Sequence, residues 1–522
     1  MKRSMFVLVF LFLSFELLPA PYNTGMVTWR QPDGITTFTA QLTGDEFSIK
    51  FTTSGGYEIR EGAGGWFFYA ILDGTGKIVP GNLKVGINAP PSTSLNMAPS
   101  PAAQSAINQR KLDFQQQLIE ADAWYKQKIL AANGEPISLK IGVILVDFAG
   151  NHEHYTNSSN FPNGYPSQLY NDMLFSQSTY IDISGTNNVH PENKKVFGSL
   201  RDYLNQQSCG KLDITGKIVN QVGQPEILNP PDPLHPDVPQ WVYVSGTKDY
   251  WNTLPNGLFS NSEVEDNAES IGIQLRDANG NYIYDEIIYI YAGLNYTGEG
   301  GLHPGAPSGG IKFQMSERWY HGDPNAAFFS HIGVYCHEFG HLLGAQDEYD
   351  GDNSIDPTRW DLMSNGNYNG PTGMGECPAG FDPFYRIKWN WANVNYLNDM
   401  SYNNYSITYN YQQPNYYRLD NPFNPGQYFL IENRLRAGFD KYTPNDPLYP
   451  PSPIQYDPNG NEGGLVVWTI DESASYGDRV DLRSAFYDSD PYYNPQFGTA
   501  DPFPYNNPDG ISGVNMVLPL IV

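Results

Sequence analysis

The chain has 522 residues, and 40% of them are hydrophobic, which is enough for more than one buried core. Acidic residues outnumber basic ones by 56 to 30. The resulting net charge of −26 repels nucleic acid and anionic lipid, so we expect neither as a partner. Three cysteines exclude a disulfide-rich scaffold. The 51 glycines and 41 prolines favour a protein rich in loops and strands.

The N-terminus has the pattern of an export signal. Lys2 and Arg3 precede an apolar run over residues 5–13, and a Leu-Leu-Pro sequence leads to Ala20, where cleavage can occur. We therefore predict a signal peptide at residues 1–20 and a secreted, extracellular protein. No later segment is apolar over the length that a bilayer span needs, so we expect no stable membrane anchor, and we expect a monomer.

The next part of the chain predicts a small β-rich unit followed by a helix. Residues 21 to about 88 form short apolar and aromatic runs separated by glycine, which is typical of strands. A stretch rich in proline, alanine and serine, up to Pro101, predicts a linker. No glycine or proline interrupts residues 105–132, so we predict a helix there. We assign residues 21–100 to the β-rich unit and 101–137 to the linker and helix.

A largely apolar run at residues 139–148 predicts a strand buried on both faces. We place it at the start of a second domain, residues 138–395. Later in this domain, oxygen-bearing side chains surround a glycine turn, an arrangement that resembles a calcium loop but lacks the full EF-hand spacing. They are Asp277, Asn279, Asn281 and Asp285. A polar turn before a core strand is the alternative interpretation. Residues 396–522 predict a β-rich C-terminal region.

The strongest chemical signal is the pattern H-E-x-x-H-x-x-G-x-x-D, on a helix predicted from roughly Phe328 to Leu343. His337 and His341 are four residues apart, so they project from one helix face and can hold one metal ion. Glu338 lies beside the first histidine, where it can reach a water at the metal. Gly344 can end the helix with a left-handed backbone, and the chain can then present Asp347 as a third zinc ligand.

Three alternatives stay open at this point. The helix can be a buried one whose histidines only satisfy hydrogen bonds. The peptidase can be a gluzincin, in which a distant glutamate such as Glu376 replaces Asp347 as the ligand. The chain can also be a secreted, non-enzymatic β-rich adhesin with a relic metal site. The presence of every residue that the chemistry requires favours an enzyme.

The motif, together with the following Glu348-Tyr349-Asp350, resembles the immune inhibitor A family of secreted bacterial zinc peptidases. The likeness extends to residues 145–148, 208–212 and 428–434. It also includes Leu362-Met363-Ser364, where this family, like other metzincins, has a methionine turn below the metal. Two positions depart from the family pattern: Thr469 replaces an expected histidine, and Tyr291 stands where His-Ala-Gly is usual. We assign no site to either position.

The resemblance implies an α+β fold, with a zincin or metzincin-like catalytic domain built from a mixed sheet and an active-site helix. A β-rich N-terminal pro-region and a β-rich C-terminal region would flank it. The implied enzyme is a secreted zinc metalloprotease, an endopeptidase made as a zymogen. Its substrates are proteins or peptides, and its cofactors are zinc and calcium. The composition break at residues 90–101 and the helix before residue 138 predict release of the pro-region between roughly Ala131 and Leu139. The implied site has His337, His341 and Asp347 as zinc ligands, Glu338 as general base and Met363 as floor.

Overall fold

The computed structural model describes most of the chain outside its two ends. The described residues are 22–23, 26–44, 49–62, 65–149, 165–218, 241–254, 256–294, 302, 312–319, 327–349, 358–397, 405–406, 414–443, 463–474, 479–483 and 515–516. The predicted signal peptide at residues 1–20 lies outside them.

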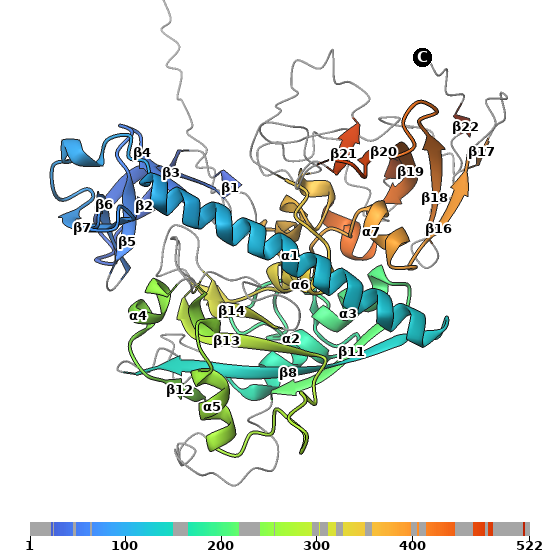
Figure 1. Cartoon of the computed structure of the whole chain (residues 1–522), viewed down its shortest axis with the longest axis horizontal. Helices are drawn as coiled ribbons and strands as arrows, with labels where there is room; N and C mark the ends of the chain where they lie inside the picture. Colours follow the sequence, from blue (N-terminus) through green and yellow to red (C-terminus); the bar gives the residue numbers. More distant parts are fainter. Residues whose placement is uncertain are drawn as a thin grey trace, which may run out of the picture.

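The N-terminal unit consists of two small antiparallel sheets around one apolar core (Figure 1). The first sheet has the order β1-β3-β2 with β4 beside β3, and the second has the order β5-β6-β7. Their bounds are β1 Tyr22–Asn23, β2 Val27–Arg30, β3 Thr37–Gly44, β4 Ile49–Thr53, β5 Ile59–Gly62, β6 Trp66–Leu72 and β7 Ile78–Lys84. Trp29, Phe51 and Phe67 form the centre of this core, with ring centroids 4.6 to 5.6 Å apart.

A single long helix, α1 (Pro101–Ala132), leads from this unit across the next domain (Figure 1). Ser100 caps its N-terminus by accepting a hydrogen bond from the backbone N–H of Ala103, and Asn133 ends it in the left-handed conformation. The helix begins earlier than the predicted Ser105 because proline fits a first helical turn, where no backbone N–H is needed.

A six-stranded mixed sheet organises the domain that carries the metal motif. Its order is β11-β8-β13-β14-β15, and β12 also pairs with β8. All pairs are parallel except β14 with β15, which is antiparallel. The bounds are β8 Ile137–Phe148, β11 Leu212–Ile218, β12 Val242–Val244, β13 Glu286–Leu294, β14 Lys312–Trp319 and β15 Phe328–Phe329. The mixed α+β architecture predicted from the sequence is therefore confirmed.

Helices cover both faces of this sheet. Side chains of β8 alternate between the faces, as a pleated strand requires: Val143 packs with α2, α3 and α6, whereas Ile144 packs with α4 and α5. This is why β8 is apolar almost throughout. The helices are α2 Ser167–Phe175, α3 Leu200–Gln207, α4 Lys248–Thr253, α5 Glu263–Ser270 and α6 Ile332–Leu342, and two short strands, β9 Ile181–Asp182 and β10 Val196–Phe197, pair beside them.

The predicted start of the active-site helix is wrong by a few residues. Phe328 and Phe329 form the edge strand β15, which pairs with Arg318 and Trp319 of β14, and α6 begins only at Ile332. Tertiary strand pairing overrides here what an apolar run by itself suggests, since both elements favour such residues.

The C-terminal region forms a five-stranded sheet of order β16-β18-β19-β20-β21. Its bounds are β16 Asn393–Tyr396, β18 Asn415–Asp420, β19 Gln427–Leu435, β20 Gly463–Asp471 and β21 Val480–Arg483. The short strands β17 Tyr405–Ser406 and β22 Asn515–Met516 form a separate antiparallel pair. Trp468 of β20 packs with Trp360, which follows the metal motif in sequence. α7 (Pro383–Lys388) also contacts this core through Phe384 and Ile387.

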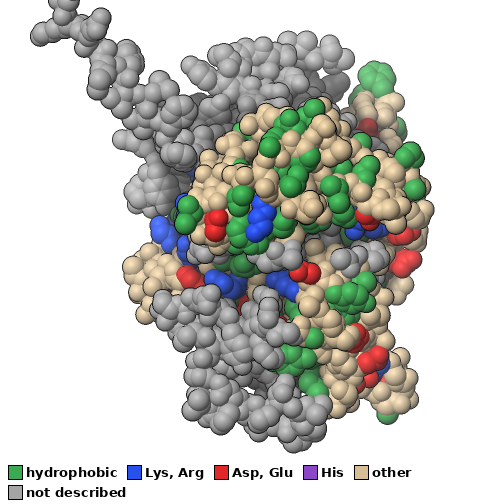
Figure 2. All heavy atoms as spheres, turned by 90° about the vertical axis from the view of Figure 1, so that its left-hand side faces the viewer, with side chains coloured by type: hydrophobic (Ala, Val, Ile, Leu, Met, Phe, Trp, Pro, Cys, Tyr) green, Lys and Arg blue, Asp and Glu red, His purple; other side chains and the backbone are tan. Residues whose placement is uncertain are grey.

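On the face drawn in Figure 2, acidic and basic side chains lie interspersed with apolar ones. Within the described part of the chain, no helix combines the length and apolar character that a bilayer span needs. None of the three cysteines, Cys209, Cys336 and Cys377, forms a disulfide.

One buried acid on the central sheet has a consequence for stability. The Glu317 carboxylate on β14 accepts hydrogen bonds from the Tyr170 hydroxyl (2.5 Å) and the Gly293 N–H (3.0 Å). Burial raises the pKa of Glu317 to about 8, against 4.5 for an ordinary glutamate. Between these values the folded chain binds a proton that the unfolded chain has lost, so stability falls as pH rises through this window.

We predict that the free energy of unfolding falls less between pH 5 and 8 in Glu317→Gln than in the wild type. One fully shifted carboxyl contributes up to about 1.4 kcal/mol per pH unit to the free energy of unfolding. Urea unfolding at several pH values measures the slope for each protein. Glu120→Gln, at an exposed position on α1, is the control and should keep the wild-type slope. An unchanged slope in Glu317→Gln would contradict the assignment.

Candidate metal centre

The helix α6 carries three of the predicted site residues. It is apolar on most sides and contacts β14, α1 and α3, and every one of its residues is buried. His337 and His341 are one turn apart, and Glu338 follows the first of them. These three side chains and Asp347 are at most 4% exposed.

A tight turn at the end of α6 brings Asp347 back towards the histidines. Gly344 has a φ of +86°, a conformation in which a Cβ would be strained. The Gly344 N–H donates to the His341 carbonyl, and the Ala345 N–H donates to the Gly340 carbonyl. These bonds satisfy carbonyls that the end of a helix otherwise leaves without a partner. The left-handed turn predicted from the glycine is therefore present.

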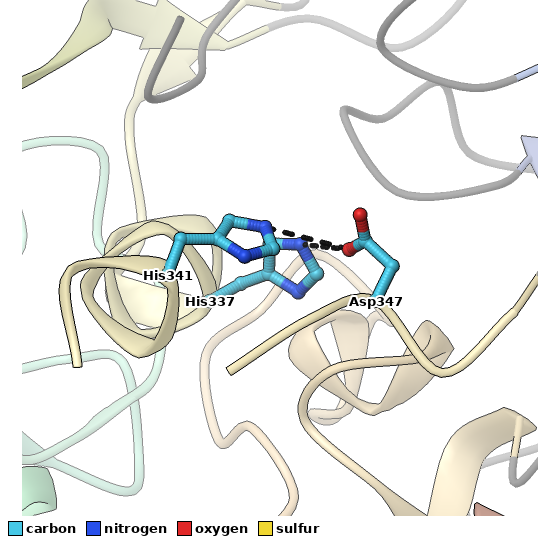
Figure 3. Close-up of side chains that lie close together, drawn as sticks. All are labelled: His337, His341 and Asp347. Carbon is cyan, nitrogen blue, oxygen red and sulfur yellow. Dashed lines mark ion pairs between the residues drawn. The ribbon is translucent and has the colours of Figure 1, made fainter. Parts of the chain in front are cut away.

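The two histidines and the aspartate converge on one point (Figure 3). The distance from Asp347 Oδ1 to His337 Nε2 is 3.1 Å, and the distance to His341 Nε2 is 3.4 Å. Among the described residues, these three form the one group of at least three His, Cys, Asp or Glu side chains close enough to share an ion. Burial by itself would raise the pKa of Asp347, but the two histidines, in their positively charged form, hold it below its usual range.

This arrangement fits a tetrahedral zinc ion. With bonds of about 2.0–2.1 Å, tetrahedral ligand atoms lie about 3.3–3.4 Å apart, close to the two distances found here. His337 Nδ1 donates to the Leu362 carbonyl at 3.0 Å, and His341 Nδ1 donates to the Ala345 carbonyl at 2.9 Å. Because carbonyls only accept hydrogen bonds, both rings carry their proton on Nδ1. Each Nε2 lone pair is thus directed towards the shared point.

The segment around Met363 lies directly beneath the helix. A Cβ on Gly340 would lie 2.5 Å from Met363 Sδ, so the methionine packs against the helix turn between the two histidines. The Met363 carbonyl accepts a hydrogen bond from the N–H of Glu348, the residue after Asp347. The preceding carbonyl, that of Leu362, holds His337. Met363 therefore contacts both the helix turn between the two histidines and the loop that carries Asp347.

Buried carboxyls hold this segment in turn. Asp361 accepts hydrogen bonds from the backbone N–H groups of Met363 and Asp382. Burial, and then the charge of Asp382, raises the pKa of Asp361. Burial raises the pKa of Asp382 itself to about 6. Glu348 accepts a hydrogen bond from the Val480 N–H of β21, so the C-terminal sheet also supports the loop that carries Asp347.

The alternative ligand Glu376 does not belong to the metal group. Its carboxylate accepts hydrogen bonds from the Met374 N–H at 3.0 Å and from the backbone N–H and hydroxyl of Thr372. These bonds give the glutamate a structural role in its own loop. The geometry therefore favours Asp347 over Glu376 as the third ligand.

The predicted calcium loop has other partners for its carboxylates. Asp277 accepts hydrogen bonds from the backbone N–H groups of Asn279 and Asn281. Asp285 pairs with Lys128 at 2.6 Å and accepts the Lys140 N–H. These contacts agree with the alternative interpretation, a polar turn before the core strand β13. The described residues give calcium no support.

Sequence reasoning missed the groups that orient the ligands. The carbonyls of Leu362 and Ala345 fix both histidine rings, and the indole N–H of Trp389 donates to the Leu343 carbonyl at the end of α6. A backbone carbonyl carries no signal in the sequence, because every residue has one. Asp361 is an exception, because its place two residues before Met363 could have marked it as a support of that turn.

Two histidines and a glutamate on one helix, with an aspartate that returns to the histidines from the following loop, are the arrangement of a metallopeptidase site. The chain matches the family Immune inhibitor A peptidase M6, catalytic domain, over residues 127–227 and 311–395. The match covers less than half of the chain and supports a relation to an immune inhibitor A-like peptidase family, which the motif also predicts. The segment 228–310, which includes β13, lies between the matched parts. A search among curated proteins gave no match.

We predict that Gly344→Ala disrupts the metal centre more than an equal change elsewhere. Its Cβ would lie 2.5 Å from the backbone of Asp122 in α1, in addition to the strain of a positive φ. Gly280→Ala is the matched control, because Gly280 has a φ of +85° with no atom within 4 Å of the added Cβ. The control should lose about 1–2 kcal/mol of stability. Gly344→Ala should lose more and also bind less zinc, measured by urea unfolding and metal analysis. Equal losses in both variants would contradict the prediction.

Proposed function

We propose that this chain is a secreted zinc endopeptidase that hydrolyses peptide bonds of extracellular proteins. The observation that carries the proposal is the convergence of His337 Nε2, His341 Nε2 and Asp347 Oδ1 on one buried point. The match to a peptidase catalytic domain supports the reaction class. The pattern of residues 1–20 supports export. The proposal includes zinc as the resident metal and does not extend to calcium.

The chain's own groups divide the reaction between binding and proton transfer. His337, His341 and Asp347 would hold the ion, and Leu362 and Ala345 keep the two rings in the required tautomer. Bound zinc supplies Lewis-acid chemistry, which makes a water nucleophilic near neutral pH and polarises a peptide carbonyl. Glu338 takes the proton from the attacking water. It returns this proton to the leaving amine nitrogen as the C–N bond breaks.

The proposed arrangement of the whole chain is that of a zymogen with a metzincin-like catalytic domain. Residues 21–100 form a unit with its own core, separate from the core around α6, which supports a removable pro-region. The near-complete burial of Glu338 and the three ligands is consistent with a latent form. The C-terminal sheet would remain with the enzyme, because Val480 contacts the metal loop through Glu348.

We predict that Glu338→Gln abolishes hydrolysis and leaves zinc bound. The amide keeps the size of the side chain but cannot take up the proton, and loss of a general base costs about 10²–10⁴-fold in rate. Casein or peptide hydrolysis gives the rate, and metal analysis gives the zinc content. Wild-type turnover in this variant would overturn the proposed mechanism.

We predict that Asp347→Ala loses zinc, whereas Glu376→Ala keeps it. Both residues are buried carboxylates near α6, but only Asp347 faces the two histidines. Zinc content and peptidase activity of the two variants separate the proposed site from a gluzincin, which requires the reverse result. Clearing of casein by the wild type, and its loss on addition of a chelator, separates the enzyme from a non-enzymatic adhesin.

A further inference from the structure

The helix α1 contacts the metal-bearing segment at one of the ligands themselves. The ring of Phe114 lies edge-on to the ring of His341, with centroids 5.1 Å apart and planes at 80°. Phe114 is 6% exposed and belongs to the same core as α6. The His341 ring is thus held between the Phe114 ring and the Ala345 carbonyl, so it has little freedom to rotate.

A second contact holds the turn after the helix. Gly344 packs so closely on α1 that a Cβ would lie 2.5 Å from Asp122 N and Cα. The side chain of Asp122 pairs with Lys388 of α7 at 2.9 Å. α1 thus lies against both His341 and the turn that leads from it to Asp347.

A third contact joins α1 to the aromatic residues that cap the end of α6. Tyr125 is fully buried, and its hydroxyl is bonded to the indole N–H of Trp391 at 3.2 Å. Its ring centroid lies 6.2 Å from that of Trp389, which donates to the Leu343 carbonyl. Tyr125 therefore supports Trp389, whose indole N–H bonds to the carbonyl at the end of the metal-bearing helix.

The buried face of α1 belongs to the catalytic domain. Phe114, Leu118 and Tyr125 lie in the core that contains α6, whereas the N-terminal unit has a separate core around Trp29. Most residues between Gly86 and Ser100, which join the two, are exposed or half-buried. The division in packing therefore falls before α1, not after it at residues 131–139.

We infer that α1 is a permanent part of the metal centre, in which Phe114 positions His341, and that proteolytic maturation falls between Gly86 and Ser100. This inference rests on the proposed zinc site. Removal of α1 would expose Trp389 and Trp391, which Tyr125 contacts. It would also free the His341 ring and leave the Gly344 turn without support. Phe114 is a positioning residue, because it acts on the metal through His341.

The first test compares two alanine substitutions in α1, each made in the full-length chain. Phe114 and Leu118 are one helical turn apart and almost equally buried, but only Phe114 contacts a ligand ring. Phe114→Ala should weaken zinc binding about tenfold, the lower limit for loss of a group that supports a ligand. It should also shift zinc release to higher pH. Leu118→Ala should leave both unchanged, although both variants unfold at lower urea. Phe114→Leu, which restores most of the volume, should recover most of the affinity.

Competition with a chelator of known zinc affinity, at several pH values, measures these effects without reference to activity. Equal zinc affinity in Phe114→Ala and Leu118→Ala would overturn the positioning role. Tighter zinc binding or higher peptidase activity in Phe114→Ala would also overturn it and would make α1 an inhibitory cover. A wild-type chain that binds no zinc would instead refute the proposed function on which the inference rests.

The second test is the N-terminal sequence of the active secreted form. A start between Gly86 and Ser100 supports the inference. A start near Pro21 overturns the maturation site between Gly86 and Ser100 and refutes the proposed pro-region, although α1 stays in the enzyme. A start between Ala131 and Leu139, in a form from which α1 has dissociated, overturns it. The zinc content of the same sample shows whether the form without α1 still holds the metal.

Discussion

The approach of Asp347 to two histidine rings is the constraint on which the rest of this structure depends. A buried carboxylate beside two imidazoles is stable only if all three share a positive charge, so the surroundings must hold them in one geometry. The helix supplies the histidines at the right spacing. The left-handed turn at Gly344 then reverses the chain within a few residues, which only a glycine does at low cost.

Segments distant in sequence converge on the end of α6. α1 approaches Gly344 and His341, the turn at Met363 lies under Gly340, and β21 reaches the metal loop through Val480. These contacts come from three different regions of the chain, which explains why a short helix can be completely buried. They also bind the C-terminal sheet and α1 into one body with the site. The N-terminal unit, in contrast, keeps a core of its own.

The sequence predicted the site better than its surroundings because the two depend on different information. Ligand spacing on a helix follows from local geometry, so His337, Glu338 and His341 could be assigned from the pattern alone. The loop at Asp277 had the composition of a calcium site, but its oxygens are bonded within the turn, and Asp285 turns to Lys128. Composition cannot distinguish these outcomes, since both need oxygen-bearing side chains around a glycine.

By itself, the sequence determined which side chains gather at the candidate metal site, the position of the turn and the mixed α+β class, because each follows from spacing, backbone preference or apolar pattern over a few residues. Only the tertiary structure decided which long-range partners support them. The pairing that makes Phe328 a strand residue, the carbonyl of Leu362 behind His337 and the packing of Phe114 on His341 all join segments distant in sequence. Such contacts depend on the complete arrangement of layers, and no local pattern encodes them.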